Sequence, residues 1–250
     1  MSGGNGGKGL DRRQMLARLG LGAGVFLAWS APPISAAARA EGGPRKKRWG
    51  YLIDTSRCIG CTSCMRACRA ENDVPDGYVR TWVERYRIAE NGEVTIDAPT
   101  GPEYNYPERE GKVEKGFYVP KLCNHCESSV CEQVCPVGAT YLTPDGVVLV
   151  DPDYCVGCGY CVQACPYGCR FINPTTHVAD KCTLCYHRIT KGLQPACVES
   201  CPTGARIFGD LEDPDSTISR RIRLISTRVL KPELGTRPKC RYIGLDREVI

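Results

Sequence analysis

The spacing of the cysteines constrains this 250-residue chain more than any other feature. Sixteen of its eighteen cysteines fall into four groups of four, and the first and third groups read C-x2-C-x2-C-x3-C. That run is typical of ligands to [4Fe–4S] clusters. The other two groups lengthen only the gap between the second and third cysteine. The groups are Cys58, Cys61, Cys64 and Cys68; Cys123, Cys126, Cys131 and Cys135; Cys155, Cys158, Cys161 and Cys165; and Cys182, Cys185, Cys197 and Cys201.

The residues between these cysteines suit a tight loop around a cluster. Gly60, Gly157 and Gly159 lie at positions where a positive φ and a close approach to sulfide favour glycine. Backbone N–H groups of such a loop can point at the anionic sulfurs. We expect the fourth cysteine of each group at the start of a short helix, from which it binds the other cluster of a pair. Proline follows it in three groups, and Arg69 takes that place in the first.

Three other uses of cysteine fit this pattern less well. A disulfide framework is common in exported chains, but it does not repeat C-x2-C-x2-C-x3-C-P. Zinc sites also contain C-x2-C pairs, but their cysteines usually come in pairs. Three of these groups instead contain three closely spaced cysteines. Buried structural thiols would not cluster at all. The pattern therefore favours iron–sulfur ligands.

The N-terminus predicts export. The segment 11–16 contains the pair Arg12-Arg13, an apolar stretch follows at 19–29, and Ala38-Arg39-Ala40 is a cleavage site of the A-x-A type. Residues 1–40 are therefore interpreted as a twin-arginine signal peptide, which carries folded and cofactor-loaded proteins to the periplasm. A transmembrane anchor is the weaker interpretation because the apolar stretch is short and rich in glycine. A disordered basic tail is the other alternative.

Charge argues against a nucleic-acid partner. Removal of residues 1–40 lowers the formal net charge from +5 to +1. Four oxidised clusters of about −2 each would bring the loaded protein to about −7. Basic residues near the ligands could offset this charge and raise reduction potentials, although each is equally compatible with an ordinary solvated side chain. They are Arg57, Arg66, Lys121, Arg170 and Lys181.

Several strands are expected outside the cysteine groups. A short strand is predicted at 51–54, and Asn91-Gly92 predicts a hairpin between 79–89 and 93–96. The segment 97–115 is rich in Pro, Gly, Glu and Tyr and is expected to be a loop. Asp145-Gly146 predicts a second turn before a strand at 147–151.

Several motifs carry a resemblance to a known family. GATYL, DGVVLVD and CVGCGYCVQACPYG lie between residues 123 and 174, and CPTGA follows at 201–205. With them, the chain resembles the four-cluster electron-transfer subunit of the dimethyl sulfoxide reductase family of molybdenum oxidoreductases, over about residues 50–245. With its twin-arginine signal, it resembles members of the tetrathionate, polysulfide and formate-dependent nitrite reductase type.

The resemblance implies an α+β fold of two interleaved bacterial-ferredoxin-like units, with short strands, short helices and long loops. The outer unit would combine 41–120, which includes the hairpin insertion, with 176–210. The inner unit would span 121–175, and 211–250 would form a C-terminal docking tail.

The resemblance also implies four ligand sets, all cysteine, and hence four [4Fe–4S] clusters. Cluster 1 would use Cys58, Cys61, Cys64 and Cys201; cluster 2, Cys68, Cys182, Cys185 and Cys197; cluster 3, Cys123, Cys126, Cys131 and Cys165; and cluster 4, Cys135, Cys155, Cys158 and Cys161. Of the remaining cysteines, Cys169 and Cys240 are interpreted as small buried residues. His125 is interpreted as a surface or loop histidine.

The function implied is the relay of electrons between a molybdopterin catalytic subunit and a quinone-linked membrane subunit, on the periplasmic side. The protein would be peripheral to the membrane through its partner. No catalytic constellation stands out in the sequence, so a reductase site of its own is not favoured. A freestanding periplasmic ferredoxin that serves several partners is the alternative.

Overall fold

The computed structural model describes residues 47–99, 101 and 103–249, so the predicted signal peptide lies outside the described residues. All described residues belong to one unit, Pro44–Ile250. Its strands are β1 (Trp49–Asp54), β2 (Thr81–Ile88), β3 (Val94–Asp97), β4 (Lys115–Leu122), β5 (Thr140–Leu142), β6 (Val148–Val150), β7 (Arg170–Ile172), β8 (Ala179–Lys181), β9 (Arg206–Asp210) and β10 (Cys240–Ile243). Its helices are η1 (Thr55–Arg57), α2 (Ser63–Asn72), α3 (Val130–Gln133), α4 (Tyr160–Ala164), α5 (Tyr186–Ile189), α6 (Ala196–Glu199), α7 (Thr217–Leu224) and η2 (Pro232–Leu234).

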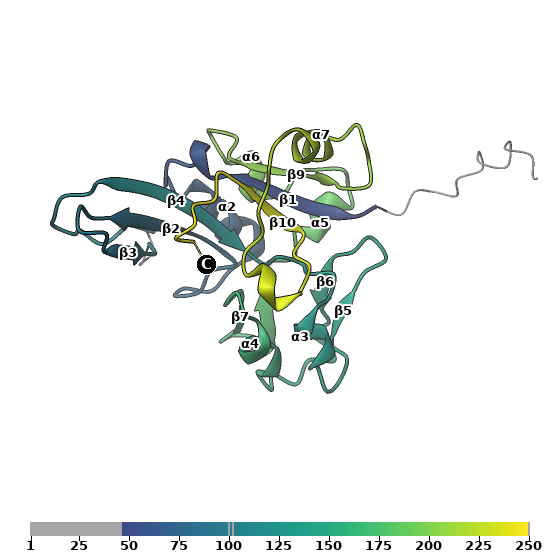
Figure 1. Cartoon of the computed structure of the whole chain (residues 1–250). Helices are drawn as coiled ribbons and strands as arrows, with labels where there is room; N and C mark the ends of the chain where they lie inside the picture. The colour runs from purple at the N-terminus through teal and green to yellow at the C-terminus, as the bar shows by residue number, and fades with distance from the viewer. Residues whose placement is uncertain (1–46, 100, 102, 250) are drawn as a thin grey trace, which may run out of the picture. The chain divides into compact units, whose positions relative to one another are not determined.

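A three-stranded sheet joins the beginning of the described chain to its end. Its order is β10-β1-β9, with β1 antiparallel to β9 and parallel to β10 (Figure 1). Ile53 in the central strand lies opposite Tyr242 of β10, and neither residue is exposed to solvent. The predicted strand at 51–54 is thus confirmed. The sheet makes the first and last segments of the described chain neighbours.

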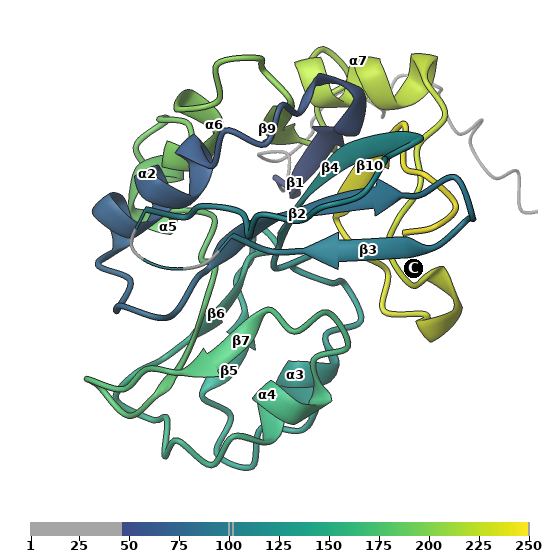
Figure 2. The same cartoon turned by 90° about the vertical axis from the view of Figure 1, so that its left-hand side faces the viewer.

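A second sheet, of order β3-β2-β4, contains the predicted hairpin (Figure 2). β2 and β3 are antiparallel, and the turn between them includes Gly92 with φ +81°. Tyr86 of β2 stacks on Phe117 of β4 at 5.0 Å between ring centroids. The segment before Lys115 is largely without strand or helix, as expected, but the sequence pattern did not predict β4, which begins there.

Two small hairpin sheets complete the fold. β5 pairs with β6 and β7 pairs with β8, each pair antiparallel. The predicted turn at Asp145-Gly146 connects β5 to β6, and the N–H of Gly146 donates to the carbonyl of Thr143 at 2.9 Å. Both hairpins lie with α3 and α4 in the lower part of Figure 2.

The helices correct one expectation about the cysteine groups. The fourth cysteine does not begin a helix: Cys135, Cys165 and Cys201 each follow the end of a short one. It is the third cysteine of each of these groups that lies inside the helix. The proline after the fourth cysteine gives the physical reason, because proline cannot continue a helix and disfavours helical geometry in the residue before it.

Helix packing brings the four groups together in pairs. α2, from the first group, contacts α6, from the fourth, while α3 and α4, from the second and third, contact each other. None of the described helices is both long and apolar enough to cross a membrane.

Candidate metal centres

The ligands expected for cluster 3 line a single cavity. All four of its cysteines, from Cys123 to Cys165, face this space, together with Arg170, Tyr167 and Thr236. Cys123 is buried, and the other three are half-buried. Four thiols around one enclosed space are a donor set that suits a [4Fe–4S] cluster.

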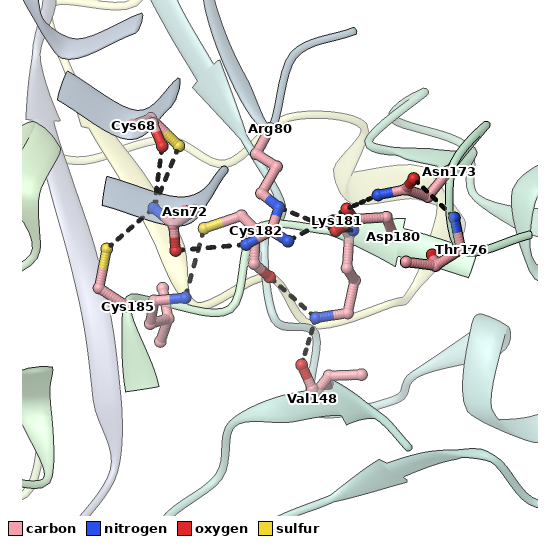
Figure 3. Close-up of polar contacts among 11 residues, drawn as sticks. Cys68, Asn72, Arg80, Val148, Asn173, Thr176, Asp180, Lys181, Cys182 and Cys185 are labelled. Carbon is pink, nitrogen blue, oxygen red and sulfur yellow. Dashed lines mark hydrogen bonds and ion pairs between the residues drawn. The ribbon is translucent and has the colours of Figure 1, made fainter. Parts of the chain in front are cut away.

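The ligands expected for cluster 2 line another cavity, although the first of them lies more than a hundred residues before the others. Its walls include Cys68, Cys182, Cys185 and Cys197. Polar side chains reach these sulfurs: Tyr51 Oη lies 3.1 Å from Cys197 Sγ. Asn72 Nδ2 lies 3.7 Å from Cys68 Sγ and 3.6 Å from Cys185 Sγ (Figure 3). These contacts can become hydrogen bonds to cluster ligands.

The ligands expected for cluster 1 meet near the loop between η1 and α2. Burial raises the pKa of Cys58 to about 11, and the thiols of Cys64 and Cys201 contribute in the same direction. Cys64 is buried, whereas Cys61 is exposed. The structure thus brings Cys201 to the first cysteine group.

The ligands expected for cluster 4 are only partly brought together. Cys155 acts on the pKa of Cys161, which burial raises, and Cys155 Sγ accepts a hydrogen bond from the N–H of Ala179 at 3.3 Å. Cys158 is exposed. Cys135 comes near through the packing of α3 on α4, without a described contact to the other three.

Backbone N–H groups surround two of the fourth cysteines. Burial alone would raise the pKa of Cys201, but N–H groups of residues 203, 205 and 206 donate to its sulfur and lower it. The pKa of Cys135 is lowered in the same way, against burial, by N–H groups of residues 137, 139 and 140. Stabilisation of the thiolate favours iron binding, because the thiolate is the form that ligates metal.

The glycines of the ligand loops have the predicted positive φ. Values are +71° for Gly60, +68° for Gly157 and +79° for Gly159. A Cβ on Gly60 would lie 2.3 Å from the Tyr118 ring, and one on Gly157 would lie 2.3 Å from the carbonyl oxygen of His177. Gly159 has open space around it.

No three Cys, His, Asp or Glu side chains in the described part of the chain converge closely enough to hold a single metal ion. The four thiolates around an iron–sulfur cube bind different irons, so they need not converge on one point.

The structure shows that His125 is not a surface histidine, which corrects the interpretation from the sequence. It lies in the loop between two ligands, but it is only 2% exposed and lines the cavity of cluster 3. Its Nδ1 accepts a hydrogen bond from the N–H of Val148 at 3.1 Å. Burial holds its pKa well below the ordinary value, so the imidazole is neutral. The expected burial of Cys169 and Cys240 is confirmed.

The five basic residues selected from the sequence have different environments. Arg57 and Arg66 are exposed, and Lys121 forms an ion pair with Glu84 at 2.7 Å. Arg170 and Lys181 are buried. Sequence reasoning missed Arg206, which is only 2% exposed. It is the fifth residue after Cys201, as Arg170 is the fifth after Cys165, and this shared offset was a signal that could have revealed it.

Comparison with known proteins identifies iron–sulfur domains in this chain. Two family models described as a 4Fe–4S dicluster domain match residues 57–139 and 114–211. The chain is 48% identical to a tetrathionate reductase subunit of Salmonella typhimurium, over 94% of this chain and 89% of the relative. It is 39% identical to one of the polysulfide reductase chains of Wolinella succinogenes, over 77% of this chain and 92% of the relative.

A third relative is not named as a reductase subunit. The protein NrfC of Escherichia coli is 41% identical, over 77% of this chain and 78% of the relative. Two dicluster domains, four complete cysteine groups and enclosed spaces lined by thiols fit four [4Fe–4S] clusters as cofactors. The chain therefore belongs to the iron–sulfur electron-transfer subunits of the dimethyl sulfoxide reductase family.

Proposed function

We propose that this protein relays electrons between a molybdopterin catalytic subunit and a quinone-linked membrane subunit of an exported respiratory oxidoreductase. The observation that carries this proposal is the set of four complete cysteine groups in a chain that covers 89% of a protein named as a reductase subunit. A protein named as a subunit acts together with others, and the names of the relatives include tetrathionate and polysulfide reductases.

We further propose the crossed ligand sets of clusters 1 to 4 and, with them, two interleaved ferredoxin-like units. Three observations support this pairing. Two of the sets each line one cavity, including the set that combines Cys68 with Cys182. The helices pack in the pairs α2 with α6 and α3 with α4. Finally, β1 pairs with β9, which follows the fourth cysteine group.

When bound, the clusters supply one-electron redox centres. The chain's own residues hold the thiolates in place and shield them from water, since only Cys61 and Cys158 among the proposed ligands are exposed. Hydrogen-bond donors near the sulfurs, such as Tyr51 and Asn72, stabilise negative charge there.

We also propose that residues 1–40 direct export by the twin-arginine route. Thiols that bind clusters would be oxidised to disulfides if the chain crossed to the periplasm unfolded. A route that accepts a folded and loaded protein avoids that loss.

The proposed units follow the ligand sets. The outer unit would combine 41–120 with 176–210, the inner unit would span 121–175, and 211–250 would be available for docking.

Two measurements on affinity-purified native protein test the proposal. We expect about sixteen irons and about sixteen acid-labile sulfides per chain. We also expect a large molybdenum-containing subunit and an integral membrane subunit to co-purify in stoichiometric amounts. Tightly bound zinc with little sulfide would contradict the cofactor assignment. A loaded monomer without partners would instead favour a freestanding ferredoxin.

A further inference from the structure

Four buried lysine and arginine side chains form no ion pair among the residues that the structure describes. One of them, Lys239, donates to the carbonyl oxygen of Gly146, and neither residue lines a thiol-lined cavity, so it differs from the other three. Arg206, Arg170 and Lys181 are 2%, 5% and 1% exposed, and none of them forms an ion pair in the part of the chain that the structure describes. Arg206 Nη1 and two nitrogens of Arg170 also have no hydrogen-bond partner there. Arg80, by contrast, pairs with Asp180 at 2.8 Å. A buried, unpaired charge is unfavourable, so these three cations indicate negative charge that the side chains do not supply.

Lys181 lies between the cavities of clusters 2 and 3. Its Nζ donates to the carbonyl oxygen of Cys182 at 2.9 Å, and Cys182 lines the cavity of cluster 2. The same Nζ donates to the carbonyl oxygen of Val148, which lines the cavity of cluster 3 (Figure 3). One ammonium group thus connects the walls of both cavities.

Arg206 connects clusters 1 and 2 in a similar way. Its backbone N–H donates to Cys201, a proposed ligand of cluster 1. Its Nη2 donates at 2.8 Å to the hydroxyl of Thr81, which lines the cavity of cluster 2. Burial opposes the charge, yet the thiols of Cys64 and Cys197, from clusters 1 and 2, raise the pKa of this guanidinium.

Arg170 connects clusters 3 and 4. It lines the cavity of cluster 3, and its Nη1 donates to the hydroxyl of Thr140 at 3.2 Å. Thr140 in turn forms hydrogen bonds with Cys135, a proposed ligand of cluster 4. Arg170 and Arg206 therefore have the same offset from a fourth cysteine, and each donates to a buried threonine.

We propose that each of these cations occupies one junction between consecutive clusters, Arg206 at 1–2, Lys181 at 2–3 and Arg170 at 3–4, and raises the reduction potentials of the two clusters it separates. The inference rests on the proposed ligand sets. Its physical basis is electrostatic: each cluster is anionic and gains a further negative charge on reduction. A cation in a medium of low dielectric constant stabilises that charge and weakens the repulsion between neighbouring clusters.

The test is a redox titration, followed by electron paramagnetic resonance, of the loaded protein and three variants. Arg206→Gln should lower the potentials of clusters 1 and 2 only, Lys181→Gln those of 2 and 3, and Arg170→Gln those of 3 and 4. We expect at least a tenfold fall in each reduction equilibrium constant, which corresponds to about 59 mV for one electron. Lys191→Gln, at an exposed position, removes the same charge and should shift nothing.

Conservative variants separate charge from packing. Arg206→Lys, Arg170→Lys and Lys181→Arg keep the positive charge and should retain potentials close to those of the unmodified protein. Unchanged potentials in the Gln variants, or equal shifts of all four clusters, would overturn the inference. A Gln variant could fail to load its clusters. In that case, cluster loading in the matching conservative variant supports a role of the positive charge. If the conservative variant also fails to load, the side chain has a packing role and the inference is overturned. An unmodified protein without four titrating clusters would contradict the ligand sets themselves, before any variant is compared.

Discussion

Two glycines of the third cysteine group have the same backbone geometry and different surroundings. Both Gly157 and Gly159 have a positive φ, but only a Cβ on Gly157 would meet a backbone atom, the carbonyl oxygen of His177. A flexible side chain could move away, whereas a carbonyl within a turn cannot do so cheaply. The two positions therefore separate the effect of close approach from that of φ alone.

We predict that Gly157→Ala prevents loading of the cluster held by Cys155, Cys158 and Cys161, so that about four of about sixteen irons are lost. Gly159→Ala serves as the matched control. It should keep all its irons and cost about 1 kcal/mol in the free energy of unfolding, the strain of a left-handed alanine. Iron analysis and denaturant unfolding of both variants would check this. Full iron content in Gly157→Ala would show that the turn between β7 and β8 moves to accommodate the added methyl group.

A second prediction concerns the crossed ligation. Cys201→Ser should damage the cluster that uses Cys58, Cys61 and Cys64, although the nearest of these precedes it by more than a hundred residues. The reason is that the structure brings Cys201 to Cys58 and that the fourth cysteine of such groups serves the other cluster of a pair. Electron paramagnetic resonance of the variant would identify the lost signal. Loss only of the cluster that uses Cys182 and Cys185 would refute the pairing.

At this scale the spacing of the cysteines is enough to propose the ligands, because a cluster fixes the local chain around it. The burial of His125 and Arg206 could not. Each is buried by segments distant in sequence: Val148 contacts the imidazole, and Thr81 contacts the guanidinium. A charged or polar residue is usually exposed, and only tertiary structure reveals the exceptions.

Among the elements, α2 is longer than the other cysteine-group helices because no proline follows the fourth cysteine of its group. The other three cysteine groups have proline after the fourth cysteine, and their helices α3, α4 and α6 have four or five residues. In the first group Arg69 takes that place, and α2 continues through Cys68 to Asn72 for ten residues. The extension places Asn72 beside Cys68 and Cys185, two of the ligands proposed for cluster 2.

We predict that Arg69→Pro destabilises the protein by about 3 kcal/mol, because proline would remove a backbone N–H from inside α2 and clash with the preceding turn. Arg69→Ala is the control. It keeps the helix and loses the side-chain contacts with Tyr104, with Asp76 and with the carbonyl oxygens of Pro75 and Tyr78, at about 1 kcal/mol. Denaturant unfolding of the loaded proteins would measure both. Equal losses would mean that the helical extension itself adds no stability.

Turn residues made the hairpins predictable, since Asn91-Gly92 and Asp145-Gly146 determine the local chain direction. β4 was not predictable because its strand partner, β2, lies across a long loop. The predicted helix positions were wrong: α3, α4 and α6 each include the third cysteine of their group and end before the fourth, and α2 continues through the fourth. Pro136, Pro166 and Pro202 contain the information that corrects them.

For the whole molecule, the export hypothesis gives the clearest prediction. The double change Arg12→Lys and Arg13→Lys should leave a cluster-loaded protein in the cytoplasm. The reason is that the arginine pair is recognised through its guanidinium geometry as well as its charge. Fractionation with an antibody against residues after Glu41 would measure this. A single change at Arg18, outside the pair, is the control and should not alter export. Undiminished periplasmic protein in the double variant would mean that another route exports the protein.

The sheet of order β10-β1-β9 also determines when folding of the protein can be completed. β1 leaves the ribosome early, but its two hydrogen-bonding partners, β9 and β10, begin more than 150 residues later in the chain. Until about residue 243 has emerged, β1 lacks at least one of these partners, and the nascent chain cannot close the sheet. Completion of this sheet therefore has to wait for the synthesis of β10. A prematurely terminated product would expose apolar strand edges that chaperones and proteases recognise, which gives the cell a way to remove incomplete copies before export.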